Sequence, residues 1–120
     1  MLVPAVRGVV RLVTASGTPT AERWAGLRGA MELATTAQER RAVLGGLREV
    51  HTIDALKLVA KYTSTKGLTE EAGAAAARIA DKVGMQDKTL ARSVLWDVIK
   101  NVRNRRTRGE AQRALRKLGK

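Results

Sequence analysis

At 120 residues the chain is long enough for one domain with a buried core, and its 44% hydrophobic residues exclude a wholly disordered chain. Aromatic residues make up only 2%, so the core must consist of aliphatic side chains, which favours packed helices over a β-sandwich or barrel. The absence of cysteine and the single histidine exclude disulfides, thiolate zinc sites and multi-histidine metal sites, while the net charge of +12 points to an anionic partner or a strongly solvated surface.

Apolar residues recur at helical spacing along nearly the whole chain, without the alternation of a strand. Pro4 suits the first turn of a helix that continues to Val13. After a short loop, Thr18 or Thr20 is expected to cap a second helix that runs to about Ala34.

The middle of the chain predicts two further helices joined closely. Thr36 and Glu39 fit a capping box, in which the threonine oxygen accepts an amide and the glutamate reaches back. The helix that follows has Leu47 in its buried stripe. His51 then forms a tight joint with a structural or solvent-exposed role, and Thr52 caps the fourth helix.

Three more helices complete the chain. Gly67 suits a left-handed helix end, and Thr69 is expected to cap a fifth, alanine-rich helix that stops at Gly84. Asp87 is a plausible cap for the sixth helix, and the segment 107–110 fits a second capping box for the seventh. Seven helices with short joints leave no room for a sheet.

An internal repeat links the helices in pairs. Residues 5–13 align with residues 42–50 at an offset of 37, with five identical positions. Ile79 follows Leu47 by 32 residues, and Leu115 follows Ile79 by 36. Helix pairs of this length bury their apolar faces by stacking on their neighbours.

Three segments resemble parts of HEAT-like repeats, namely 39–47, 55–59 and 70–80. The repeats they resemble are of the kind found in large bacterial multidomain secreted or envelope proteins. The resemblance implies an all-α, right-handed α-solenoid of about three and a half helix pairs, serving as a scaffold or binding surface without catalytic residues or cofactors. It also leads us to expect residues 1–120 to be a single domain, a fragment or module of a longer chain. The strong positive charge departs from such modules, and the compartment stays open between cytoplasm and envelope or secretion.

A basic segment closes the chain. Residues 100–120 contain nine basic residues against one acid, whereas residues 1–99 contain 14 basic and 10 acidic residues. This segment supplies the candidate site for an anion or a partner: Lys100, Arg103, Arg105, Arg106, Arg108, Arg113, Arg116 and Lys117. It contains no aromatic residue, so base stacking is not expected there.

The sequence therefore predicts a non-enzymatic protein-interaction or scaffold module with an acidic partner. The alternatives are a nucleic-acid-binding module that contacts phosphates non-specifically, a structural spacer, and a segment whose charge only solubilises the chain. Trp24, Trp96 and Asp97 are similar in type to residues of HEAT-like DNA glycosylases, but their spacing favours packing instead. Gly45 and Gly46 predict that a neighbouring helix approaches closely there. The sequence contains no run of about 18 apolar residues, so it predicts no membrane-spanning helix.

Overall fold

The computed structural model describes residues 2–15 and 17–119, without the side chains of residues 2–5 and 7. Within these ranges the chain forms seven α-helices, one short 3-10 helix and no strand, which confirms the all-α prediction. The elements are α1 (Leu2–Val13), α2 (Thr20–Leu33), α3 (Ala37–Leu47), α4 (Ile53–Ala60), α5 (Thr69–Val83), η1 (Gly84–Gln86), α6 (Lys88–Asn101) and α7 (Arg105–Leu118).

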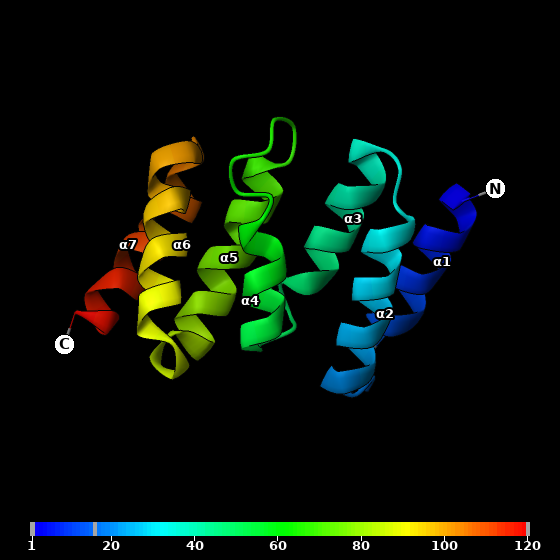
Figure 1. Cartoon of the computed structure of the whole chain (residues 1–120), viewed down its shortest axis with the longest axis horizontal. Helices are drawn as coiled ribbons and strands as arrows, with labels where there is room; N and C mark the ends of the chain where they lie inside the picture. Colours follow the sequence, from blue (N-terminus) through cyan, green and yellow to red (C-terminus); the bar gives the residue numbers. More distant parts are fainter. Residues whose placement is uncertain (1, 16, 120) are drawn as a thin grey trace.

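The helices follow one another along the longest axis of a molecule that measures 46 × 30 × 20 Å (Figure 1). Helices α1, α3, α5 and α7 form one row, since each contacts the next odd-numbered helix. Helices α2, α4 and α6 lie beside this row, and each contacts the odd-numbered helices next to it in the chain. We call this second set the even row.

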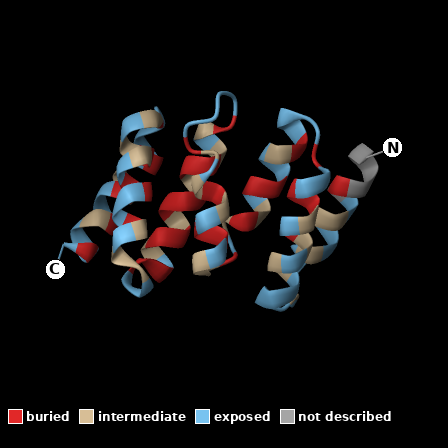
Figure 2. Cartoon of the chain, in the orientation of Figure 1, coloured by how far each residue is buried: buried red, intermediate tan, exposed pale blue. Residues whose placement is uncertain are grey.

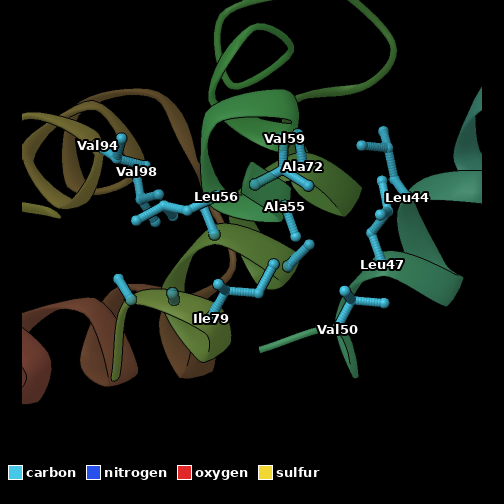
Figure 3. Packing of buried hydrophobic residues seen from close by; sticks show 14 of the residues in the cluster. Leu44, Leu47, Val50, Ala55, Leu56, Val59, Ala72, Ile79, Val94 and Val98 are labelled. Carbon is cyan, nitrogen blue, oxygen red and sulfur yellow. The ribbon is translucent and has the colours of Figure 1, made fainter. Parts of the chain in front are cut away.

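The core lies between the two rows and is aliphatic, as the composition predicts (Figure 2). Figure 3 shows its centre, where buried side chains of α3, α4, α5 and α6 point toward one another. Leu44, Leu56 and Ile79 are among its largest fully buried members. Helix α5 contacts α3, α4, α6 and α7, and its buried stripe consists mainly of alanine.

Close approaches between helices occur at glycines. A Cβ added at Gly46 would lie 2.8 Å from a methyl carbon of Leu27, which confirms the expected approach there. The same expectation is wrong for Gly45, whose added Cβ meets no described atom within 4 Å. A second contact was not foreseen: a Cβ at Gly73 would overlap the side chain of Val102.

Three of the predicted helix caps are confirmed. Thr36 Oγ1 accepts the Glu39 amide at 3.1 Å, and Glu39 Oε1 accepts the Thr36 amide at 3.2 Å, which completes the capping box. Thr52 accepts the amide of residue 55, and Asp87 accepts that of residue 90, each at 3.1 Å. Gly67 has a φ of 84°, the left-handed conformation expected of it.

The other predicted caps are wrong. Helix α2 follows Pro19 without a side-chain cap, so neither Thr18 nor Thr20 fills that role. Thr69 is already inside α5, and its hydroxyl donates to the carbonyl oxygen of Thr65 at 3.1 Å. The capping box expected at 107–110 is absent, because Asn104, three residues before Thr107, caps this helix.

Leu56→Ala should lower the free energy of unfolding by about 2–5 kcal/mol, because it leaves a cavity between α4 and its neighbours. Leu12→Ala is the matched control, since Leu12 is 76% exposed and the same substitution there should change stability by at most about 0.5 kcal/mol. Urea unfolding followed by circular dichroism measures both. Equal losses in the two variants would contradict this description of the core.

Glu39 should make folding sensitive to acid. Hydrogen bonds from Thr35 and Thr36, the largest being that of the Thr35 amide, lower the pKa of this buried carboxyl below its usual value. Its ionisation therefore stabilises the fold fully above the unfolded pKa of about 4.3 and stops doing so as pH falls through the lower folded pKa. The native chain should have a higher free energy of unfolding than Glu39→Gln at about pH 7. This difference should shrink as the pH falls to about 3. A constant difference would contradict this.

Candidate anion-binding surface

The basic C-terminal segment is divided over several parts of the surface, because a local cap sets the start of α7. Asn104 Oδ1 accepts the amides of Arg106 at 2.9 Å and Thr107 at 3.2 Å. Helix α7 therefore begins at Arg105 and buries Thr107 in its first turn, so Thr107 cannot be its cap. This start fixes which basic side chains of α7 share a side. Lys120 lies outside the described residues.

One set of arginines lies on the side of α7 turned away from α5. The buried stripe of the helix contacts α5 and α6 and consists of Thr107, Ala111, Ala114 and Leu118. Away from it, exposed polar residues recur at intervals of three and four: Arg105, Arg108, Gln112 and Arg116. We call Arg105, Arg108 and Arg116 the outward arginines. Within the described residues none of them forms an ion pair.

A second set faces α5 and is mixed with carboxylates. Arg106, Arg113 and Lys117 line two adjoining polar hollows of about 390 and 430 Å³ between α5 and α7. Four acidic residues line the same hollows: Glu70, Glu71, Asp81 and Glu110. Lys117 Nζ lies 2.6 Å from Asp81 Oδ1, so this lysine is already paired. This side of α7 therefore presents alternating charges rather than a continuous positive surface.

A further ion pair extends the mixed surface to α3. Arg78 Nε lies 2.9 Å from Glu49 Oε1, and both side chains are about half exposed, which limits the contribution of the pair to roughly 0–1 kcal/mol. His51 Nε2 lies 3.8 Å from the other oxygen of Glu49. His51 is thus a neighbour of a surface ion pair.

The joint between α6 and α7 is held by a residue from another helix. Glu70, in the first turn of α5, accepts the backbone amides of Arg103 at 3.0 Å and Asn104 at 3.1 Å. Arg103 lies on a shallow hollow with Arg41 and Lys66. No local sequence pattern reveals the contact of Glu70 with a joint that lies 33 residues further along the chain.

Lys100 is separate from the arginines of α7. It is exposed near the end of α6, one helical turn after Trp96. Trp96 is 61% exposed, so the expectation that it packs as an interface or half-buried residue is wrong. Trp24 is half-buried and packs against the core, as expected. The basic residues of segment 100–120 are therefore divided among the two sides of α7, the joint before it and the end of α6.

Glu70→Ala should loosen the joint between α6 and α7. The substitution removes two hydrogen bonds to a charged carboxylate. If the joint loses about 1 kcal/mol of local stability, amide hydrogen exchange at Arg103 and Asn104 should be about fivefold faster. Glu71→Ala is the control. It removes the same charge from the next position, but the Glu71 carboxylate accepts no hydrogen bond within residues 17–119. Similar exchange rates in both variants would show that Glu70 does not hold the joint.

The described residues support neither a metal site nor a membrane-spanning helix. No group of three His, Asp or Glu side chains there is arranged to hold a metal ion. None of the helices described is long and apolar enough to cross a membrane. Comparison with known proteins finds no match to a family model, to a curated protein or to a solved structure.

Proposed function

We propose that the chain is a non-enzymatic interaction module that binds the acidic surface of a partner protein through the outward arginines. The observation that carries the proposal is their arrangement: Arg105, Arg108 and Arg116 are exposed along one helix and none is ion-paired within the described residues. Arginines attract carboxylates over a distance and bind them in pairs of hydrogen bonds.

We also propose that the scaffold is a right-handed HEAT-like α-solenoid of about three and a half helix pairs. The two rows of helices, in which α1 contacts α3 and α3 contacts α5, support it. The internal repeat supports it as well. Val6 and Val43 occupy equivalent positions and are both fully buried, and Gly8 and Gly45 are equivalent and both lie beside open space. Equal environments at an offset of 37 residues are typical of stacked repeats.

A protein partner fits α7 better than nucleic acid does. The hollows on the other side of α7 from the outward arginines are lined by Glu110 of α7 and by Glu70 and Asp81 of α5, among cations. An acidic protein surface presents carboxylates at separate positions and can meet the outward arginines without facing the carboxylates of α5, whereas a continuous phosphate backbone would be repelled by them. A structural spacer would be favoured by exposed apolar surface on the first or last helix. Leu12 on α1 is exposed, whereas α7 presents arginines on its outward side.

The triple variant Arg105→Ser, Arg108→Ser and Arg116→Ser should weaken binding to a labelled oligoglutamate peptide about tenfold, and binding of the native chain should weaken as salt rises. The control triple variant removes the same charge from scattered exposed positions: Arg11→Ser, Lys66→Ser and Lys82→Ser. Fluorescence anisotropy measures binding and circular dichroism checks the fold. Equal losses in the two variants, or no binding at low salt, would contradict the proposal.

A further inference from the structure

All three aromatic residues of the chain lie on or next to the helices of the even row. Trp24 is on α2 and Trp96 is on α6, while Tyr62 lies in the turn after α4, two residues beyond its last residue. None of them lies on the odd-numbered helices, which include the basic helix α7. The few aromatic side chains of this protein are therefore gathered on one of its two rows, and two of them are only half-buried while the third is mostly exposed.

Two of the aromatic residues line an open groove between α2 and α4. The groove has a volume of about 470 Å³, and Trp24 and Tyr62 line it together with the apolar side chains of Met31 and Leu58. This volume is within the range of sites that bind small organic molecules, so a planar base has room beside either ring. The groove is unrelated to the outward arginines, which are on α7.

Cations lie within one helical turn of these rings. Arg28 follows Trp24 by four residues, and Lys57 and Lys61 line the same groove from α4. Two carboxylates, Glu32 and Asp54, also line it, which leaves cations in the majority.

The same combination recurs on α6. Arg92 and Lys100 lie one turn before and one turn after Trp96, and all three are exposed. The guanidinium of Arg92 donates to the carbonyl oxygen of Leu118 at 3.0 Å, which holds it beside the helix. Lys100 forms no ion pair within the described residues.

We propose that the exposed side of the even row binds single-stranded nucleic acid, with bases stacked on Trp96 and in the groove of Trp24 and Tyr62. Aromatic faces interleaved with cations are the combination that binds single strands, because unpaired bases stack while lysine and arginine contact the phosphates. A duplex hides the faces of its bases and cannot use the rings in this way. An acidic peptide without aromatic groups would gain no stacking energy from the indoles, so stacking is what distinguishes a single strand from such a peptide.

The test titrates the full chain with a labelled oligothymidine, with a duplex of the same length and with oligoglutamate, across a salt series. The chain has two tryptophans, and both are on the proposed surface, so stacked bases should quench its intrinsic fluorescence. We expect oligothymidine to bind with quenching and with strong salt dependence, and the duplex to bind more weakly without quenching.

Trp96→Ala separates stacking from charge, since this exposed side chain can be removed without opening the core. Loss of one stacked base should weaken oligothymidine binding by about 5- to 100-fold. The pair Lys57→Ser and Lys61→Ser should weaken it more than the pair Arg105→Ser and Arg116→Ser, which removes the same charge from α7. Circular dichroism confirms that the variants fold.

Each contrary outcome would overturn the proposal. Absence of binding at low salt would remove nucleic acid as a ligand. Unchanged binding in Trp96→Ala without quenching would exclude stacking, and equal losses in the two charge variants would show attraction by net charge alone. Full competition by oligoglutamate would show that both ligands share one anion-binding surface, which contradicts a separate stacking site on the even row. The α7 triple variant tests the proposed protein partner separately, so either proposal can fail alone.

Discussion

The packing of α5 against four other helices is the constraint on which the rest of the structure depends. Small side chains make this packing possible. Ala72, Ala75, Ala76 and Ala77 are buried on α5, and their short side chains let the neighbouring helices lie close to it. The approach is closest at Gly73, where any Cβ would overlap Val102 at the end of α6. Larger residues on this face would push α6 and its joint to α7 outward, since a packed core has no free space to absorb them.

The same helix decides which charges α7 presents. Glu70 in the first turn of α5 binds the amides of Arg103 and Asn104, and Asp81 near its other end pairs with Lys117. These contacts hold α7 at its start and in its last turn, which fixes its rotation about its own axis. The rotation turns Arg106, Arg113 and Lys117 toward the carboxylates of α5 and leaves the outward arginines without them. The buried stripe of α7 and its polar contacts with α5 together determine which charges this surface presents.

Sequence spacing predicted several local features correctly, although the caps expected at Thr18 or Thr20 and at Thr69 are wrong, and it could not predict features that distant residues decide. The caps by Thr36, Thr52 and Asp87 involve partners three residues away, so spacing alone reveals them. Asn104 and Thr107 are both competent caps, and the local pattern favours the wrong one because the contact of Glu70 with the joint comes from 33 residues away. The helical character of the whole chain was predictable from its periodicity, whereas the exposure of Trp96 was not, because apolar residues surround it on α6 in sequence but not in space.

The charge count along the chain is a poor guide to the surfaces for the same reason. Residues 100–120 form one cluster in sequence, yet Lys100 is exposed beside Trp96 on α6, while the outward arginines are on α7. The lack of an aromatic residue within the cluster argues against base stacking only if the cluster acts as a unit, and the fold divides it. Once it is divided, the even row combines rings with cations and α7 combines cations with carboxylates. The two surfaces have different chemistry, which is why a different class of partner is assigned to each.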